Sequence, residues 1–490
     1  MSSKSQNIAT EIIDLVFENN ALIFKEEYNN ACIALEGSGN EIVEINSTAF
    51  IEWLADLCYE NLEGYVPSTA IEKQVVKVLQ AKARRGGERY NLEINIAKNN
   101  TAILYDLGKG VVKITDKNWS VVDNPPIVFR KPYGQLQQSK PKRGGDVKEL
   151  LKFFNITNES EQLLILCYII TLFVPGILYP VLILHGTQGA GKSFLMEIMK
   201  SLVDHTELEK GLNTPKDEQD FALHAMHNYL LFYDNLSGVK EQFSDALCRA
   251  VTGATFTTRK LYSNNEVFTV KFNRPVILNG LNQIVSKSDL LDRSLVMQLE
   301  RVSDEKRKEP ALLKAEFEEL KPYILGSIFD AIIKAQSKFS VVSQYRGLSR
   351  MTEFDHWACA IAEVLGYGQD KFRQARLDNI QMQHGYAIEA SPSGTAIMEF
   401  MRDKEEWVGE PAELYGLLEP HWARLHLEKP KDAPRLGKAV NTLVPNLRGR
   451  GIITTRPPRG DVRLIKFVNI AKTTDGSDGT DSSDSKNGED

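Results

Sequence analysis

The stretch Val181-Leu-Ile-Leu-His-Gly-Thr-Gln-Gly-Ala-Gly-Lys-Ser193 decides the fold of this chain. Its apolar first half is typical of a buried parallel strand, and its second half matches the Gly-x-x-x-x-Gly-Lys-Ser phosphate loop. The amphipathic residues 194–203 predict a helix directly after it. This order sets backbone N–H groups and the positive end of a helix dipole against the phosphates of a nucleoside triphosphate. A chance glycine-rich turn is the alternative, and the flanking strand and helix argue against it.

The loop predicts a role for each of its main residues. Gly186, Gly189 and Gly191 allow the backbone to approach the phosphate oxygens. The Lys192 amine can reach the β and γ phosphates, and the Ser193 hydroxyl can hold Mg²⁺. ATP and Mg²⁺ are therefore the expected cofactors.

Length and composition limit the remaining possibilities. A chain of 490 residues is too long for one core and should form about three or four domains. Because 59 Lys and Arg nearly balance 65 Asp and Glu, any nucleic-acid surface must be a local patch. Five scattered cysteines without C-x-x-C spacing argue against a disulfide framework or a zinc site and favour a reducing, cytosolic compartment. The polar N-terminus has no apolar signal core, so secretion is not expected.

Changes in composition predict five segments with an α/β core. We expect an α+β N-terminal domain (1–145), the P-loop core (146–305), a helical subdomain (306–390), a basic domain (391–472) and a disordered acidic tail (473–490). Helices are predicted at 8–17, 49–61, 69–82, 311–337 and 351–365, and strands within 92–129. Residues 135–145, basic and glycine-rich, are interpreted as a linker. The apolar run 163–174 is shorter than the ~20 residues of a membrane span and is predicted to be a buried helix.

Three polar residues complete a candidate ATPase site. Asp234 follows the apolar run 229–233, and a carboxylate at a strand end beside the phosphate loop can hold the water shell of Mg²⁺. Asn279 ends a third apolar strand, where it can orient water or sense the γ-phosphate. Arg293 can stabilise the transferring phosphoryl group, in trans if it projects from a neighbouring subunit. Each residue alone is equally consistent with a turn or a surface salt bridge, and their order behind a phosphate loop favours the ATPase interpretation.

A basic hairpin is predicted between the second and third strands. Residues 255–262 and 266–272 alternate in the β pattern around an Asn-rich turn. Arg259, Lys260 and Lys271 are its cations, and Tyr262 and Phe268 offer stacking surfaces. Such a hairpin can grip single-stranded DNA in the pore of a ring. A structural hairpin with solvated charges is the alternative.

The order of these motifs resembles the superfamily 3 helicases of the AAA+ class, and more narrowly the primase-helicase-type ATPases of phages, plasmids and integrated elements. The resemblance is close over residues 181–300 and looser over 100–150 and the C-terminal part. It is carried by the phosphate loop, Asp234-Asn235, Ser244–Arg249, Thr252-Gly253, Arg-x-Leu-Tyr at 259–262, Asn279 and Asp292–Ser294. It implies an AAA+ core, a homo-oligomeric ring with a hexamer favoured, Lys192 and Ser193 as nucleotide and Mg²⁺ contacts, Asp234 as metal-shell carboxylate, Asn279 as sensor and Arg293 as finger.

Asn235 departs from that family pattern. Many of these ATPases have a second acid there, and an amide can orient water but cannot accept its proton. Glu197 and Asp245 are weak candidates for the base, and slow hydrolysis is the other possibility. No Asp-x-Asp strand pattern occurs in residues 1–145, so we predict that the chain does not synthesise primers.

The segment 421–472 carries the local basic excess. Twelve Lys and Arg face three acids there, a pattern typical of nucleic-acid binding. A helix is predicted to open at Pro434, with an apolar stripe at 436, 440, 443, 444 and 447 and with Arg435, Lys438 and Asn441 on another face. It precedes a hairpin with Arg456 and Arg459 at a basic tip, which is the layout of a winged helix. Pro445 should interrupt the last turn of this helix. A basic winged helix that binds protein is the alternative to one that binds duplex DNA.

These features favour an ATP-dependent DNA helicase that serves replication of a mobile element. The alternative is an ATP-gated DNA-binding initiator or helicase loader that does not itself unwind DNA. Asn235 favours the alternative slightly, whereas the basic hairpin favours translocation. A metabolic P-loop kinase has little support because no acceptor-binding module is visible.

Overall fold

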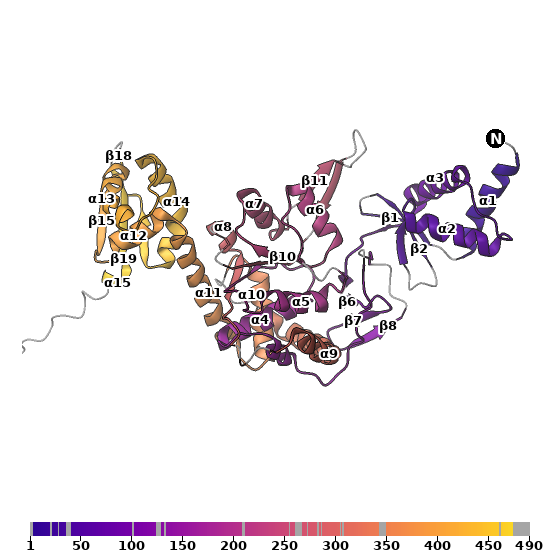
Figure 1. The fold of residues 1–490 in the computed structure, drawn as a ribbon, viewed down its shortest axis with the longest axis horizontal. Coiled ribbons are helices and arrows are strands. Elements are labelled where there is room, and N and C mark those ends of the chain that lie inside the picture. The colour runs from indigo at the N-terminus through magenta and orange to yellow at the C-terminus, as the bar shows by residue number, and fades with distance from the viewer. Residues whose placement is uncertain are drawn as a thin grey trace, which may run out of the picture. The chain divides into compact units, whose positions relative to one another are not determined.

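The computed structural model describes residues 3–473 except 20–21, 28, 36–40, 100–101, 124–128, 132–133, 208–210, 254, 260–266, 272, 282–283, 286, 304, 306–307, 343–348 and 460–461. The fold is mixed α/β, with helices and several separate sheets (Figure 1). The chain divides into two compact units. The first contains Met1–Asn282 and Met297–Ala375, and the second contains Gln283–Val296 and Arg376–Asp490.

The first unit begins with a small α+β layer. Its sheet has the order β3-β2-β1-β4, with β1–β2 and β2–β3 antiparallel and β1–β4 parallel. Helices cover the sheet through fully buried Ile12, Phe50, Leu54 and Leu79. The three helices predicted here are confirmed. The elements are α1 (Ser3–Glu18), β1 (Leu22–Glu26), β2 (Ala31–Leu35), β3 (Glu41–Glu44), α2 (Thr48–Asn61), α3 (Thr69–Gly86) and β4 (Arg89–Tyr90).

A four-stranded antiparallel meander follows, as the β-rich segment predicted. Its strands pair in chain order, β5-β6-β7-β8. The turn between β6 and β7 contains Gly108 and Gly110, both with positive φ of 81°, a conformation that glycine adopts without steric cost. The strands are β5 (Ile96–Asn99), β6 (Ala102–Asp106), β7 (Val111–Ile114) and β8 (Trp119–Val122).

Residues 135–145 do not form a free linker, so that interpretation is wrong. The buried Gln138 amide donates to the Tyr105 hydroxyl at 2.7 Å. A Cβ added at Gly326 would lie 1.9 Å from the Lys142 carbonyl oxygen, so the two backbones touch. The segment is packed because its polar groups find partners in the core, which composition does not reveal.

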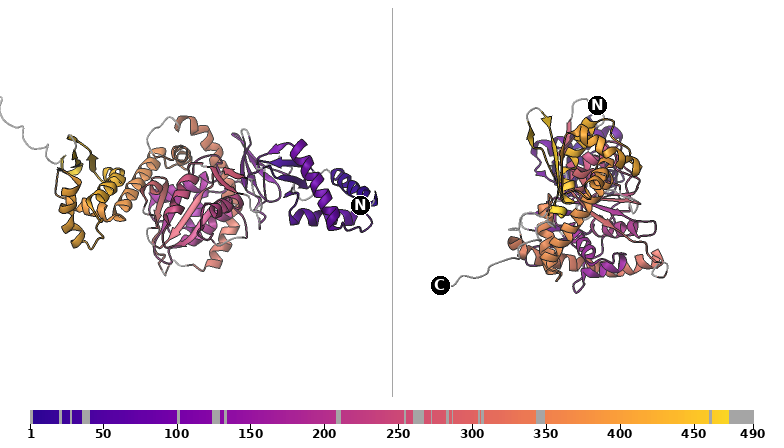
Figure 2. Two further views of the ribbon diagram at one scale, coloured as in Figure 1. Left: turned by 90° about the horizontal axis from the view of Figure 1, so that it is seen from above. Right: turned by 90° about the vertical axis from the view of Figure 1, so that its left-hand side faces the viewer.

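The part of the first unit that contains the phosphate-loop motif is built on parallel strands. β10 pairs with β13, and β13 pairs with β9, all in parallel, and helices pack around them (Figures 1 and 2). β14 (Ser294–Gln298) spans the boundary between the two units. The other elements up to the hairpin and third strand are η1 (Val147–Phe153), α4 (Glu159–Thr171), β9 (Val181–His185), α5 (Lys192–Val203), α6 (Glu218–His227), β10 (Leu231–Leu236), α7 (Glu241–Ala250), β11 (Thr255–Arg259), β12 (Val267–Lys271) and β13 (Val276–Gly280).

The apolar run 163–174 is buried, and its residues up to Thr171 form the C-terminal part of helix α4, so the predicted buried helix is confirmed but ends three residues earlier. Asn158 caps α4 by accepting hydrogen bonds from the Ser160 and Glu161 amides, and every residue from 163 to 171 is buried. The Tyr168 hydroxyl donates to the Val276 carbonyl of β13 at 3.4 Å, which ties the helix to the sheet. Among the described residues, no helix is both long and apolar enough to cross a membrane. Helices α9 (Pro310–Val342) and α10 (Thr352–Val364) also belong to this unit and confirm the two helices predicted there, and the unit ends at Ala375, within α11 (Gln369–Glu389).

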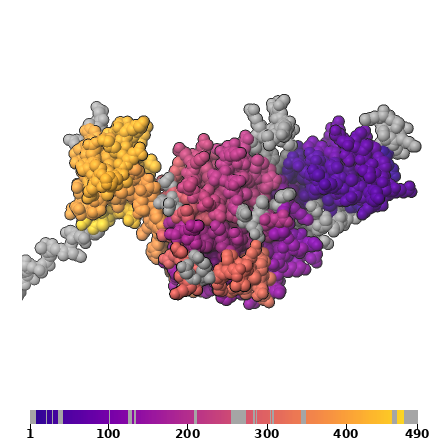
Figure 3. Space-filling model, in the orientation of Figure 1, coloured from indigo at the N-terminus to yellow at the C-terminus, as the bar shows by residue number. Residues whose placement is uncertain are grey.

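The second unit combines a short helix, α8 (Ser288–Leu291), with the C-terminal module. That module has a three-stranded antiparallel sheet in the order β15-β19-β16, and its atoms form a closely packed body (orange and yellow in Figure 3). The interruption expected at exposed Pro445 does not occur, because the helix continues to Gly449. The elements are α11 (Gln369–Glu389), α12 (Pro392–Met401), β15 (Glu406–Gly409), α13 (Pro411–Arg424), α14 (Ala433–Gly449), β16 (Ile452–Thr455), β17 (Pro458–Arg459), β18 (Val462–Arg463), β19 (Ile465–Asn469) and α15 (Ile470–Thr473).

Candidate nucleotide-binding site

A cavity of about 480 Å³ lies at the carboxyl ends of β9, β10 and β13. This volume falls in the range of ordinary ligand pockets, roughly 300–1,000 Å³. The cavity brings together the phosphate loop and the polar ends of the two neighbouring strands, which are far apart in sequence. Its lining residues are Gln188–Phe194, Asp234, Asn235, Asn279, Gly280 and Leu281.

The backbone of the loop requires glycine at two positions for different reasons. At Gly186, φ is 148° and an added Cβ would lie 2.1 Å from the Leu299 carbonyl oxygen, so no side chain fits. At Gly191, φ is 79° and the residue is the N-cap of α5. The left-handed cap therefore begins α5 at the cavity wall, and the N-terminus of a helix is suited to binding an anion.

The Lys192 ammonium folds back over the loop. Nζ donates to the Gly186 carbonyl at 2.7 Å and to the Thr187 carbonyl at 3.0 Å. Burial lowers the pKa of Lys192, and the Asp234 carboxylate opposes this shift. A phosphate arriving in the cavity would offer this ammonium a charged acceptor in place of neutral carbonyls.

Asp234 and Asn279 are in direct contact. The Asn279 amide nitrogen donates to Asp234 Oδ1, although 45 residues separate them in the chain. Tyr233 is paired with Leu278, after which the register shifts, so Asp234 and Asn235 leave the regular ladder at the cavity. Asn235 has φ of 55°, and its backbone N–H donates to Asp234 Oδ1 at 2.7 Å. Asn adopts this left-handed conformation more readily than most residues.

Neither weak candidate for the hydrolytic base borders the cavity. Glu197 lies further along α5, on the wall of a separate 310 Å³ pocket. Asp245 is an exposed residue of α7. Among the described residues that line the nucleotide cavity, Asp234 is therefore the one carboxylate.

Arg293 lies in a different part of the chain, in the turn between α8 and β14. It belongs to the second unit and is not among the residues that line the cavity. Its Nη1 donates to the Asp289 carbonyl at 2.7 Å and forms an ion pair with the Asp289 carboxylate. The Arg293 side chain is therefore bound to its own turn.

The predicted hairpin exists as a backbone structure. β11 and β12 pair antiparallel, with Thr255 opposite Lys271 and Arg259 opposite Val267. Lys260 and Tyr262 lie outside the described residues, as do all side chains from 254 to 272.

The basic C-terminal module confirms the predicted apolar stripe and polar face. Leu436, Val440 and Leu447 are buried, whereas Arg435 and Lys438 are exposed on α14. The exposed Arg456 guanidinium, just after β16, contacts the Asn441 side chain of α14. Arg459 is in β17, and its side chain lies outside the described residues.

Part of the basic excess in this module is neutralised. Arg424 pairs with Glu399, Lys429 with Glu419 at 2.7 Å, and Lys466 with Glu406 at 2.8 Å. The sequence count missed these partners because it began at residue 421. Residues 391–420 carry seven acids against two basic residues, and extending the count upstream would have found them.

Main-chain contacts around the loop were also missed. The Leu299 amide donates to the His185 carbonyl at 2.8 Å, and the Val302 amide donates to the Gly189 carbonyl at 3.3 Å. The segment after β14 therefore supports both ends of the loop. Since backbone groups make these bonds, no residue type could have signalled them.

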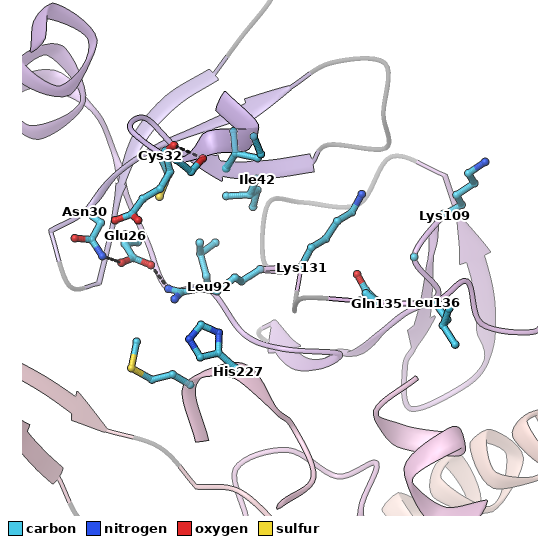
Figure 4. A pocket seen from close by; sticks show the side chains of 18 of the residues that line it. Glu26, Asn30, Cys32, Ile42, Leu92, Lys109, Lys131, Gln135, Leu136 and His227 are labelled. Carbon is cyan, nitrogen blue, oxygen red and sulfur yellow. Dashed lines mark hydrogen bonds and ion pairs between the residues drawn. The ribbon is translucent and has the colours of Figure 1, made fainter. Parts of the chain in front are cut away.

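A larger cavity of about 910 Å³ lies in the N-terminal part of the first unit, away from the phosphate loop (Figure 4). Glu26 and Cys32 lie on one side, and Lys131 and His227 point toward the same space. Burial raises the pKa of Glu26, which pairs with Arg130, and raises that of Cys32 to about 12. The Cys32 thiol is thus held in its protonated, less reactive form. The smaller cavity is the better candidate for chemistry because it holds the phosphate-loop motif.

The chain matches known proteins mainly at the level of family. The family described as actinomycete integrative conjugative element replication protein matches residues 147–383, and the C-terminal domain of the same family matches 394–482. Together these matches span about two thirds of the chain. No curated protein matches it.

Solved structures of the NrS-1 C terminal region are similar over most of their length. The A form apo structure is 13% identical, covers 94% of this chain and 98% of its own, and has a TM-score of 0.42. A second apo structure of the same region is 12% identical, covers 94% and 98%, and has a TM-score of 0.39.

Proposed function

The chain belongs to the family of actinomycete integrative conjugative element replication proteins, and we propose that it is the ATP-driven DNA helicase of such an element. The observation that carries the proposal is the convergence of Lys192, Asp234 and Asn279 on one 480 Å³ cavity. In this proposal the cavity binds ATP with Mg²⁺, the core has the AAA+ superfamily 3 architecture, and the subunits form a ring, with a hexamer favoured.

Each residue has one role in this proposal. The loop amides and Lys192 hold the phosphates, and Ser193 with Asp234 holds the metal ion and its water. The Asn279 amide, which donates to the Asp234 carboxylate, would orient the attacking water or contact the γ-phosphate. Arg293 acts on the phosphoryl group of a neighbouring subunit.

The two DNA contacts are assigned to different elements. The hairpin β11–β12, with Arg259, Lys260 and Lys271, would contact a single strand in the ring pore. The module from α12 to β19 has the element order of a winged helix, and its exposed α14 residues Arg435 and Lys438 would face duplex DNA.

A second function has a specific observation in its favour. Asn235 stands where an acid could activate water, and neither Glu197 nor Asp245 lines the cavity. An ATP-gated initiator or loader needs nucleotide binding and only slow hydrolysis, so this arrangement supports it.

Unwinding distinguishes the two functions. For the helicase, ATP hydrolysis should rise with single-stranded DNA, Lys192→Ala should remove it, and the Arg259→Ala/Lys260→Ala variant should lose unwinding of a forked duplex. Lys113→Ala/Lys117→Ala is the matched control, because it removes two exposed cations from another sheet and its turn. If the rate of ATP hydrolysis does not change with DNA and no forked duplex is unwound, the helicase function is excluded and the initiator function is favoured.

A further inference from the structure

The finger-bearing turn belongs to the same compact unit as the C-terminal module, not to the core that holds the phosphate loop. Residues 283–296 group with 376–490. In sequence, 75 residues separate Arg293 from the start of α11. The first family match ends at residue 383, and the second begins at residue 394. The structural unit therefore crosses the boundary between the two family segments.

A buried polar ladder on α11 holds this turn. The Ser294 carbonyl, next to Arg293, accepts hydrogen bonds from Arg376 Nη1 at 3.0 Å and Gln383 Nε2 at 2.8 Å. Asn379 Oδ1 accepts from the Val296 amide at 3.2 Å. Arg376 is fully buried, and Asn379 and Gln383 are at most 5% exposed. Such a ladder fixes the turn to α11, because each lost bond would leave a buried polar group unpaired.

The next residue of α11, His384, contacts helix α14 of the C-terminal module. His384 Nδ1 lies 3.3 Å from the Asn446 amide nitrogen of α14, and Asn446 is fully buried. Gly449 packs so closely that an added Cβ would lie 2.1 Å from His384 Cδ2. Burial lowers the pKa of His384, and the Asp292 carboxylate opposes this shift.

We propose that His384 is a positioning residue that couples DNA on α14 to the Arg293 turn. Gln383 holds the turn and His384 holds the end of α14, so a shift of α14 on duplex DNA moves α11 and, through it, Arg293. Duplex DNA would thereby adjust the finger and the rate of hydrolysis. The proposal rests on the proposed function for the roles of α14 and Arg293.

The first test measures ATP hydrolysis with and without duplex DNA. His384→Ala and Gly449→Ala should lower the duplex-dependent change in rate by about five-fold or more, the scale of ordinary allosteric coupling. Duplex affinity and basal hydrolysis should stay within about two-fold of wild type. His384→Gln, which can still bond Asn446, should retain most of the coupling.

Gly437→Ala is the matched control, since it makes the same substitution in the same helix. An added Cβ there meets Pro411 atoms at 3.9 Å, an ordinary contact. An unchanged melting temperature would show that His384→Ala and Gly449→Ala are folded. If duplex DNA then changes their hydrolysis rate as much as it does in the wild type, the proposal is overturned.

The second test does not need hydrolysis. Amide hydrogen exchange of residues 287–298 should change when duplex DNA binds the wild-type protein, and the change should be absent in His384→Ala. If duplex DNA binds the wild-type protein and hydrogen exchange of residues 287–298 does not change, the proposed coupling is wrong, even if the protein hydrolyses ATP. If exchange responds and no ATP is hydrolysed, the proposed function fails and the mechanical link stands.

Discussion

The Asn279 side-chain amide donates a hydrogen bond to the Asp234 carboxylate across two neighbouring parallel strands. Two residues predicted separately as sensor and metal ligand are thus one hydrogen-bonded pair. Because the pair sits opposite Lys192 in the same cavity, a change in either member should affect hydrolysis more than nucleotide binding.

Asn279→Ala should lower kcat by roughly 10²-fold, the loss typical of one transition-state donor. Nucleotide affinity should change little, because the loop and Lys192 make the ground-state contacts. Steady-state hydrolysis and fluorescent-nucleotide binding measure the two quantities. An equal loss in both would mean that Asn279 acts in binding and not as a sensor.

Asn235→Asp should increase hydrolysis several-fold if the missing acid limits the rate. Asp adopts positive φ nearly as readily as Asn, so the backbone at φ 55° should be retained. Asn235→Ala is the control, since it removes the amide without adding a base and costs about 1–2 kcal/mol of backbone strain. If Asp and Ala variants are equally impaired, the base lies elsewhere.

Asp204→Ala should lower the free energy of unfolding by about 3–5 kcal/mol, the cost of breaking a buried ion pair. Asp204 accepts from Lys200 Nζ and from the Tyr229 and Leu230 amides, all at 3.1 Å. Lys200→Met should cost less because the two amides still satisfy the carboxylate. Urea unfolding of both variants tests this order, and equal losses would contradict it.

His205 should make the protein less stable in acid. Burial lowers the pKa of His205 to about 4, whereas in the unfolded chain the imidazole binds its proton near the ordinary value of 6.5. Between those values the unfolded state binds more protons, so stability falls as pH falls, by at most ~1.4 kcal/mol per pH unit. His205→Phe should flatten this slope between about pH 6.5 and 4. An identical slope in both proteins would exclude His205 as the titrating group.

Lys438→Ala should reduce the salt dependence of duplex binding, with a change of about one in the slope of log K against log salt. Lys429→Ala is the matched control because Lys429 already pairs with Glu419 at 2.7 Å. Filter binding at several salt concentrations measures both slopes. Equal changes would show that α14 does not face the phosphates.

The local patterns were predictable because they depend on neighbours in sequence. The strand-loop-helix at 181–203, the buried helix at 159–171 and the apolar stripe of α14 each follow from hydrophobic period and glycine placement. Asp234 and Asn279 could be proposed for the same reason, since each ends an apolar strand.

Long-range partners could not be predicted. The charge pairs of Arg424, Lys429 and Lys466, the packing of residues 135–145 and the contact of Leu299 with the loop all join segments distant in the chain. The composition of a segment does not identify the distant residues that folding brings into contact with it.

Arg293 shows the difference most clearly. Its place after the third strand was evident from the order of motifs, and its attachment to α11 and the C-terminal module was not. Arg376, Asn379 and Gln383 look like ordinary polar helix residues in the sequence. They form a buried hydrogen-bonded ladder because the fold removes them from water. In the protein interior a polar group is stable only when it has a hydrogen-bond partner.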